Sequence, residues 1–354
     1  MKITGAWLTV NRACNMRCPW CYASSTKFDH AATMEADLAY RLLDLFSDLG
    51  VKGVVILGGE PTVYPHLLEV IRYTVSRNMK PVIVTNGKRL SNLSYARLLQ
   101  ATGIKDITIS LKAVESEGYR PLRISDDTDL FEQVCAAIKN VQRVGIGLNV
   151  SVTLVRSLDG KLERLVELLT KLNPKHVTVD MGTPVIKPDG TDGEGILNPL
   201  ELAEIVARLY EILKPTSLNY SFYLSIPLCL IDPKIRSEMI GAGRVLTTCH
   251  VPKGQGVVFT PEGSVILCNH FSSFPIGRFG IDFTSAQEFE VFWNSTSVTK
   301  LRSRASEFPH ERCQTCDDWD ICGGGCFVKW LHWNPELFIP EKGGDKYERA
   351  SAVS

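Results

Sequence analysis

The sequence has no hydrophobic run long enough to cross a membrane, since no stretch approaches about 18 consecutive apolar residues. It has no excess charge either, because 39 Lys and Arg balance 39 Asp and Glu over 354 residues. That balance excludes an overall attraction to nucleic acid or anionic lipid. The N-terminus lacks the charged, apolar and small-residue segments of a signal peptide. The sequence therefore predicts a cytoplasmic protein with no membrane or nucleic-acid partner.

The composition indicates a folded protein with metal or redox chemistry. Hydrophobic residues make up 44% and charged residues 22% of the chain, as in ordinary globular proteins. The chain has 11 cysteines. In a reducing compartment such thiols are more often metal ligands or redox groups than disulfides.

The first 215 or so residues alternate β-rich runs with helical patterns. Strands are expected at 6–10, 53–57, 81–85, 106–111, 147–155 and 176–181. Helices are expected after Thr33 as a cap, with Gly50 as the end, and then at 66–77, 94–101, 130–144 and 162–172. This alternation predicts a parallel sheet with right-handed crossovers. Because a closed barrel of this type has eight units, we expect an α/β fold with a partial (β/α)6 barrel.

The composition changes after residue 215. A last core helix is expected over Pro199–Leu213, and a hairpin over 257–267 with a turn at Pro261–Gly263. The segment Cys313–Cys326 is dense in Cys, Gly and Asp, and small Cys-rich units usually need metal to fold. We therefore divide the chain into a core (1–215), a linker (216–245) and a small Cys-rich domain (246–354).

Three cysteines, Cys14, Cys18 and Cys21, lie directly after the first expected strand. A [4Fe–4S] cluster takes four ligands, so three thiolates would leave one iron open for a substrate or cofactor. A zinc site or unrelated core thiols are the alternatives. A zinc site usually shows paired CxxC units and four ligands, and no fourth Cys lies nearby.

This motif, with the aromatic Trp20 before its last Cys, resembles the hallmark of radical S-adenosylmethionine (SAM) enzymes. The resemblance implies that the open iron chelates SAM and that one electron releases a 5′-deoxyadenosyl radical, which abstracts a substrate hydrogen. It also implies an external one-electron reductant such as flavodoxin or ferredoxin. In such enzymes the cofactor supplies the difficult chemistry and the protein supplies placement.

Further segments match this family at strand ends, where α/β sheets bind ligands. The implied SAM-binding residues are Trp20, Gly58, Gly59, Glu60, Pro61, Ser110, Arg120 and Thr153. Glu60 would accept a hydrogen bond from the methionine ammonium, Ser110 would contact the ribose or carboxylate, and Arg120 would bind the carboxylate. An exposed surface arginine is an equal alternative for Arg120. No residue is identified as the catalytic acid or base.

Six cysteines in the C-terminal third resemble the SPASM extension of a branch of radical SAM enzymes. They are Cys249, Cys268, Cys313, Cys316, Cys322 and Cys326. The resemblance implies one or two auxiliary [4Fe–4S] clusters. By position, Cys249, Cys268 and Cys326 would hold the first, and Cys313, Cys316 and Cys322 would hold the second. A zinc ribbon is the alternative.

Two positions depart from the SPASM pattern. No Cys follows Cys326, so the fourth ligands stay open, with His332 and Glu336 as candidates for the second cluster. Cys229 is a candidate for the first, and a buried structural thiol is an equal alternative for it. Asn269 stands where enzymes that oxidise a sulfatase Ser or Cys have an Asp base, and Asn cannot take a proton. We therefore expect no sulfatase maturation.

The expected substrate is a ribosomally made peptide, because SPASM enzymes commonly crosslink or otherwise modify such peptides. Cys14 lies too near the N-terminus for a leader-binding winged-helix domain, so either a separate recognition protein or none is expected. One alternative is radical dehydrogenation or epimerisation of a small metabolite such as an aminocyclitol or sugar. Another is a non-catalytic iron–sulfur protein for electron transfer or sensing.

Overall fold

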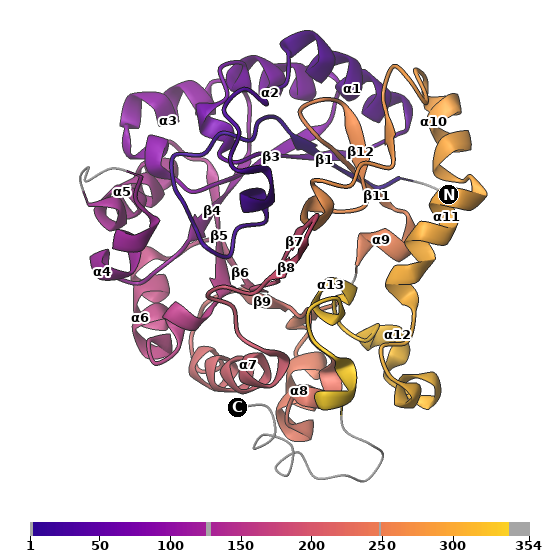
Figure 1. The fold of residues 1–354 in the computed structure, drawn as a ribbon. Helices are drawn as coiled ribbons and strands as arrows, with labels where there is room; N and C mark the ends of the chain where they lie inside the picture. Colours follow the sequence, from indigo (N-terminus) through magenta and orange to yellow (C-terminus); the bar gives the residue numbers. More distant parts are fainter. Residues whose placement is uncertain (1–2, 125–128, 248, 340–354) are drawn as a thin grey trace.

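The computed structural model describes residues 3–124, 129–247 and 249–339, which form a curved sheet with helices around its outer side (Figure 1). The strands are β1 (Gly5–Thr9), β2 (Gly53–Leu57), β3 (Lys80–Thr85), β4 (Asp106–Leu111), β5 (Gly147–Leu154), β6 (His176–Met181), β7 (Val185–Lys187), β8 (Gly190–Asp192), β9 (Tyr220–Tyr223), β10 (Val245–Leu246), β11 (Gly256–Phe259), β12 (Ser264–Ile266) and β13 (Gly277–Arg278). The α-helices are α1 (Ala36–Asp48), α2 (Leu67–Ser76), α3 (Leu93–Gln100), α4 (Ser116–Tyr119), α5 (Leu130–Arg143), α6 (Leu162–Leu172), α7 (Pro199–Leu213), α8 (Pro233–Gly241), α9 (His250–Lys253), α10 (Ala286–Trp293), α11 (Thr296–Ser303), α12 (Trp319–Cys322) and α13 (Phe327–Trp330). Short 3-10 helices that matter below are η1 (Tyr22–Thr26), η2 (Pro61–Val63), η6 (Leu228–Leu230) and η7 (Asn269–Phe271).

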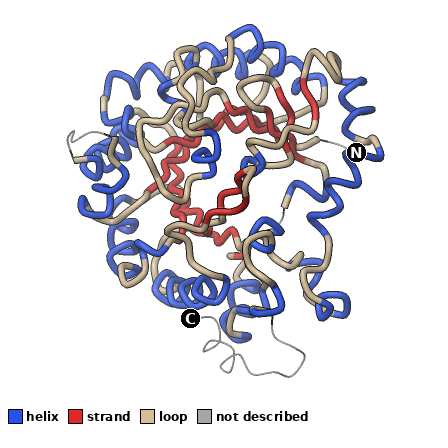
Figure 2. The backbone as a smooth tube through the Cα atoms, in the orientation of Figure 1, coloured by secondary structure: helices blue, strands red, loops and turns tan. Residues whose placement is uncertain are grey.

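The main sheet has eleven strands in the order β10-β9-β6-β5-β4-β3-β2-β1-β11-β12-β13. Strands β1 to β6 are parallel neighbours in sequence order. A helix follows each of β1 to β5, and the hairpin β7–β8 lies between β6 and α7. Figure 2 shows these strands as an open ring with the long helices outside it and a short helical segment within its opening. The predicted α/β fold with a partial (β/α)6 barrel is confirmed.

The helices stay outside the ring because each has one apolar face. In α6 the buried residues recur at helical spacing, and they are Leu162, Leu165, Val166, Leu169 and Leu172. This spacing places all five on one side of the helix. They join the continuous core that the outward-facing residues of the strands also enter. The opposite, inner face of the strands is therefore left for the functional site.

Several predicted bounds match the structure to the residue, and one predicted cap is wrong. Strands β2, β4 and β6 and helices α6 and α7 have the expected bounds. Thr33 does not cap α1, because the N-cap position belongs to Glu35. Thr33 instead pairs with Asn11 in an isolated β-bridge. That bridge connects the residues before α1 with the loop that follows β1.

The segment 216–245, expected to be a linker, is structured. It contains β9, α8 and β10, and β9 pairs in parallel with β6 of the core. At the other edge β11 pairs in parallel with β1, and β12 and β13 continue the sheet antiparallel. The sheet thus runs through both expected domain boundaries without a break. The division into separate folding units stays a prediction.

Next to β11, aromatic side chains pack α10 against the sheet. Phe289 of α10 packs against Phe259 of β11, with ring centroids 6.2 Å apart, and against Phe283 at 4.9 Å. Its ring also stacks on Trp293 one turn later at 5.6 Å. None of the helices in the described part of the chain is long and apolar enough to pass through a bilayer.

We expect Phe289→Ala to destabilise the protein by about 3–5 kcal/mol, since a buried aromatic is replaced by a cavity. Phe289 is fully buried, whereas Val291 on the same helix is 75% exposed. Val291→Ala is therefore the matched control and should change stability little. The measurement is anaerobic denaturant unfolding of both variants. Equal stability of the two variants would show that this aromatic cluster does not hold α10 in place.

Candidate functional site

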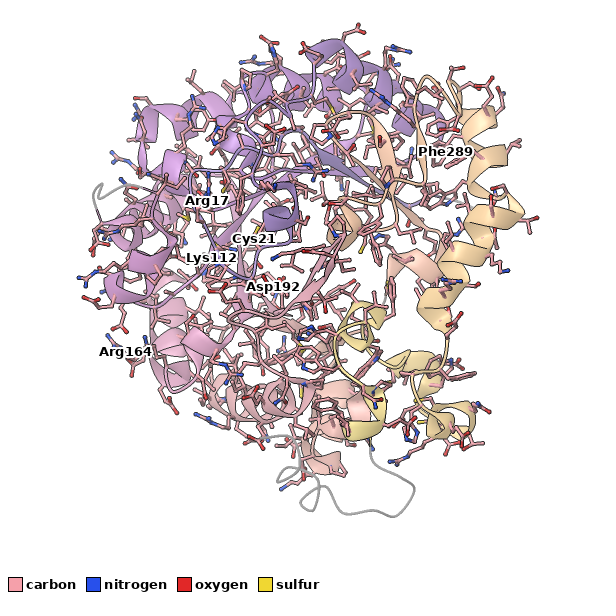
Figure 3. The ribbon with its side chains drawn as sticks, in the orientation of Figure 1. Arg17, Cys21, Lys112, Arg164, Asp192 and Phe289 are labelled. Carbon is pink, nitrogen blue, oxygen red and sulfur yellow. The ribbon has the colours of Figure 1, made fainter. Side chains whose placement is uncertain are left out.

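The loop after β1 carries the first three cysteines at the carboxyl ends of the parallel strands. Backbone hydrogen bonds hold it on both sides, from Arg12 N to Ala32 O at 2.9 Å and from Arg17 N to Leu122 O at 2.9 Å. Figure 3 places Arg17, Cys21 and Lys112 close together inside the ring. The sequence motif is thus presented at the edge of the sheet where α/β proteins bind ligands.

The three thiols lie near enough to influence one another, and all are desolvated. Burial, with smaller contributions from Glu60 and the other two thiols, raises the pKa of Cys14 to about 12. Burial likewise raises the pKa of Cys18 to about 11, and it also raises that of Cys21. Buried thiolates need a compensating positive charge, and a coordinated metal supplies it. The donor set therefore fits an iron–sulfur cluster.

Thiolate ligands are arranged differently around a cluster than around a single metal ion. Within the described residues, no three His, Cys, Asp or Glu side chains converge as ligands of one metal ion. A cubane cluster has four iron corners, so its thiolates bind different irons and do not converge on one point. A tetrahedral zinc ion needs all its ligands at about 2.0–2.3 Å from one centre.

Gly58 and Gly59 bring the end of β2 into backbone contact with the cysteine loop. A Cβ at Gly59 would lie 2.3 Å from the carbonyl oxygens of Arg12 and Ala13, and one at Gly58 would lie 2.1 Å from the Asn11 side chain. The Gly59 N–H donates to Asn11 O at 2.9 Å. The glycines are needed because the two backbones touch. They position the loop that bears Cys14.

Glu60 is buried and its carboxylate is already hydrogen-bonded within the chain. Oε1 accepts from the Thr62 N–H at 3.0 Å and from the hydroxyls of Thr62 and Thr85, both at 2.6 Å. Oε2 accepts from the Asn86 N–H at 2.7 Å. Glu60 thus joins η2 to the end of β3, a role that the sequence analysis missed. Its expected contact with the SAM ammonium stays a prediction. Oε1 accepts three of these hydrogen bonds and Oε2 accepts one.

Of the other expected SAM-binding residues, most lie around this loop. Pro61 is buried at the start of η2. Trp20 packs over Gly195, whose added Cβ would be 3.6 Å from the indole ring. Arg120 differs, because its side chain is 70% exposed and pairs with Glu117 at 3.0 Å. Its expected contact with the SAM carboxylate stays a prediction.

Two cations beside the thiols were not identified from the sequence. Arg17 donates to Cys14 O at 2.7 Å and to Met16 O at 2.9 Å, and its guanidinium lies over the Phe28 ring. Lys112, directly after β4, lowers the pKa of Cys18 against the larger effect of burial. Both charges favour the thiolate form, which is the form that binds metal.

Polar side chains line the inner face of β4 to β6. In the register, Ser110 lies opposite Ser151, and Thr153 lies opposite Asp180. Alternation along each strand places these four on one face. The Ser151 hydroxyl donates to Asp180 Oδ2 at 2.7 Å. Burial raises the pKa of Asp180, opposed by this hydrogen bond and by Lys112. Asp180 is a carboxyl group within the barrel that no sequence motif indicated.

Cys249, Cys268 and Cys326 form a second group of thiols. Burial first, and then Cys326 and Cys249, raise the pKa of Cys268. Burial and the Cys326 thiol raise that of Cys249 to about 11. This group adjoins the first one, since the ring of His270 in η7 lies edge-on to Tyr22, 5.9 Å between centroids. The structure thus brings together the three cysteines expected to share one auxiliary cluster.

Cys313, Cys316 and Cys322 line a separate pocket, which also contains Cys229. From the sequence, Cys229 was a candidate ligand of the other auxiliary cluster, and the structure instead places it beside these three cysteines. The suggested roles of His332 and Glu336 as ligands stay predictions. The His332 ring bonds the Thr191 hydroxyl at 2.7 Å, and Glu336 pairs with His310 at 3.1 Å.

Known proteins resemble this chain over most of its length. Residues 8–172 match the radical SAM superfamily. The mycofactocin maturase MftC of Mycobacterium tuberculosis is 27% identical over 329 residues, covering 89% of this chain and 76% of the relative. The subtilosin biosynthesis protein AlbA of Bacillus subtilis is 26% identical over 333 residues, covering 93% and 68%. The crystal structure of Streptococcus suis SuiB bound to S-adenosylmethionine has a TM-score of 0.71 at 18% identity, covering 94% and 75%.

The solved structure shares the α/β-barrel fold, and the family match defines the class as radical SAM enzymes, which cleave S-adenosylmethionine with an iron–sulfur cluster. Residues 8–172 form a radical SAM domain, and the chain is similar over most of its length to the maturase MftC and to AlbA. A [4Fe–4S] cluster and SAM are the cofactors of the radical SAM superfamily, which residues 8–172 match. The alternative of a non-catalytic iron–sulfur protein is therefore replaced by an enzyme.

We expect Gly59→Ala to displace the cysteine loop and lower the iron content per chain, because the new methyl group meets two backbone carbonyls. Gly53→Ala on the same strand is the matched control, since its Cβ would meet only Lys80 O at 3.8 Å. Iron and acid-labile sulfide are measured after anaerobic reconstitution. Wild-type iron in a folded Gly59→Ala protein would contradict the close packing described above.

We expect Asp180→Asn to raise the thermal midpoint of the protein at pH 8. The folded state raises the pKa of Asp180, so the ionised carboxylate costs stability above that pKa, and the cost disappears as the pH falls through it. The difference between variant and wild type should therefore shrink as the pH is lowered. Anaerobic melting curves at several pH values measure it. A variant that is less stable than wild type at pH 8 would contradict the assigned direction.

Proposed function

We propose that Cys14, Cys18 and Cys21 bind the cluster that cleaves SAM, and that the enzyme modifies a ribosomally made peptide. The observation that carries the first part is the gathering of three desolvated thiols on a loop fixed by Gly59 at the strand ends. Three thiolates would leave one iron of a [4Fe–4S] cluster without a protein ligand.

The peptide substrate is supported by the relatives. MftC is named a maturase, AlbA takes part in bacteriocin biosynthesis, and SuiB has been crystallised with its precursor peptide SuiA. The likeness to MftC and AlbA covers 89% and 93% of this chain. A peptide is thus better supported than the metabolite considered as the alternative.

The residues around the loop have distinct tasks in this proposal. When bound, the cluster and SAM supply a radical that removes a hydrogen atom from the substrate. Gly58, Gly59 and the hydrogen-bonded Glu60 hold the loop in place. Ser110 and Thr153 line the inner face along which SAM and substrate would lie.

The C-terminal thiols would hold the auxiliary clusters. We assign Cys249, Cys268 and Cys326 to the first cluster, and Cys313, Cys316 and Cys322 to the second. Such clusters suit an oxidative modification, because a substrate radical can lose its electron to a nearby cluster. An external one-electron reductant such as flavodoxin or ferredoxin would supply the first electron, and a separate recognition protein would bind the leader peptide.

We expect Cys18→Ala to abolish 5′-deoxyadenosine formation and Cys316→Ala to lower the iron content while leaving uncoupled SAM cleavage. The reason is that only the first cluster contacts SAM in this proposal. Both variants are reduced anaerobically with SAM, and 5′-deoxyadenosine is quantified by chromatography. Cys135→Ala on α5 is the control thiol. Total loss of cleavage in a folded Cys316→Ala protein would contradict this division of tasks.

The substrate class is tested by co-expression with short peptides encoded beside the gene. Mass spectrometry should show a loss of hydrogen from the peptide that depends on Cys18. Unmodified peptides, together with conversion of a sugar or aminocyclitol by the same preparation, would replace the peptide with a small metabolite.

A further inference from the structure

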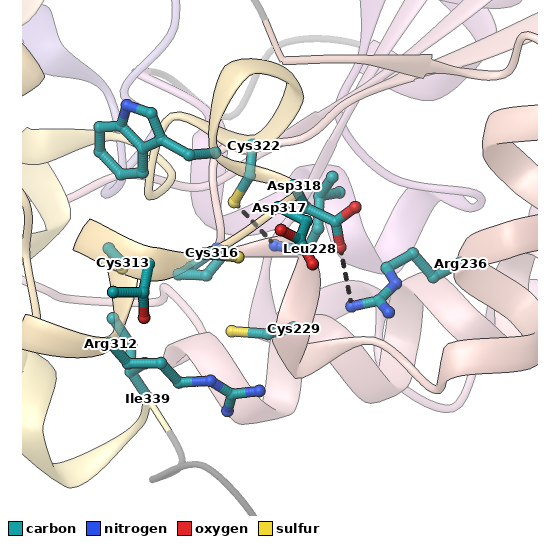
Figure 4. Close-up of a pocket in the computed structure, with 13 residues that line it drawn as sticks. Leu228, Cys229, Arg236, Arg312, Cys313, Cys316, Asp317, Asp318, Cys322 and Ile339 are labelled. Carbon is teal, nitrogen blue, oxygen red and sulfur yellow. Dashed lines mark hydrogen bonds and ion pairs between the residues drawn. The ribbon is translucent and has the colours of Figure 1, made fainter.

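Cys229 enters the same cavity as three C-terminal cysteines. Together with Cys313, Cys316 and Cys322 it lines a cavity of about 220 Å³ between η6 and the segment that ends in α12. Figure 4 shows the Cys229 side chain directed from η6 toward the side of the cavity where the other three lie. The cavity therefore unites four thiols from two segments that are far apart in the sequence.

The electrostatic neighbours of Cys229 are the thiols of this cavity. Burial first, and then the thiols of Cys322, Cys313 and Cys316, raise the pKa of Cys229 to about 11, while Arg312 lowers it. The thiols that act on Cys268 are instead Cys326 and Cys249. The auxiliary cysteines thus fall into a group of three and a group of four.

Backbone contacts fix Cys229 beside this group. The N–H of Leu228, the residue before Cys229, donates to Cys322 Sγ at 3.2 Å. Upstream, Ser225 O accepts from the Cys326 N–H at 2.9 Å. Hydrogen bonds from backbone N–H groups to cysteine sulfur help to set the potential of iron–sulfur clusters. The loop that leads to Cys229 is therefore attached to the cysteine-rich turn at two points.

The charges at the cavity wall also come from both segments. Arg236 of α8 pairs with Asp318 at 3.5 Å, so the helix that follows Cys229 contacts the residues between Cys316 and Cys322. A single zinc ion with ligands at about 2.3 Å needs far less space than this cavity offers. A four-iron cluster with four thiolate ligands suits both the number of thiols and the space.

We propose that Cys229 is the fourth thiolate ligand of the second auxiliary [4Fe–4S] cluster, together with Cys313, Cys316 and Cys322. This inference rests on the proposed function, because it requires that these three hold a cluster. It gives the second auxiliary cluster four thiolate ligands, although no Cys follows Cys326 in the sequence. Of the eleven described cysteines, the first auxiliary group then has three, and Cys135 on α5 stands outside all groups.

The test introduces Cys229→Ala into two backgrounds, each lacking one auxiliary group. The Cys249→Ala/Cys268→Ala protein retains the second group, and the Cys313→Ala/Cys316→Ala protein retains the first. Iron and sulfide per chain and the Mössbauer spectrum are measured after anaerobic reconstitution. In the first background only, we expect Cys229→Ala to lower the iron content per chain by up to the iron of one cluster, or to give one iron of that cluster its own Mössbauer signal. Cys135→Ala is the control in both.

Other outcomes would overturn the inference. An effect confined to the Cys313→Ala/Cys316→Ala background would place Cys229 at the first auxiliary cluster, and no effect in either background would make it a structural thiol. Equal iron in wild type and in Cys313→Ala/Cys316→Ala would refute a second auxiliary cluster altogether, and thus the proposed function on which the inference rests. If Cys229→Ala fails to fold, Cys229→Ser is used. It should keep the iron and shift the paramagnetic resonance signal of the reduced cluster.

Discussion

The site depends on the direct contact between two stretches of backbone at the open end of the barrel. Gly58 and Gly59 at the end of β2 lie against residues 11–13, at distances that leave no room for a side chain. Backbone hydrogen bonds from Gly59 and Glu60 to this loop hold the contact together. Since Cys14 follows within one residue, its position is set by β1 and β2 and not by a flexible connection.

Glu60 extends this constraint to the next strand. Its buried carboxylate receives hydrogen bonds from η2 and from the residues that end β3. A buried carboxylate is costly unless it is hydrogen-bonded, and here four donors reduce that cost. The ends of three neighbouring strands and the cysteine loop therefore form one rigid unit. A cofactor bound there meets a surface that is already arranged, which lowers the cost of binding.

Without metal, ionisation of the buried thiols is unfavourable. Nine of the ten grouped thiols have a raised pKa, for which burial is the main cause. Several thiols in one small space can ionise together only when a metal balances their charge. Folding of the C-terminal region and cluster binding should therefore be coupled, in line with the small size of its helices α12 and α13.

The sequence by itself determined the fold class, the bounds of several strands and helices, and the two clusters of closely spaced cysteines. Those features are local, because strand alternation, helical spacing and short Cys motifs are visible within a few residues. The tertiary structure alone decided which distant groups meet. Cys229 joins Cys313, Cys316 and Cys322, Asp180 enters the barrel beside Ser151, and the carboxylate of Glu60 turns inward. Such pairings depend on how the sheet curves and which loops pack together, and no short pattern encodes that.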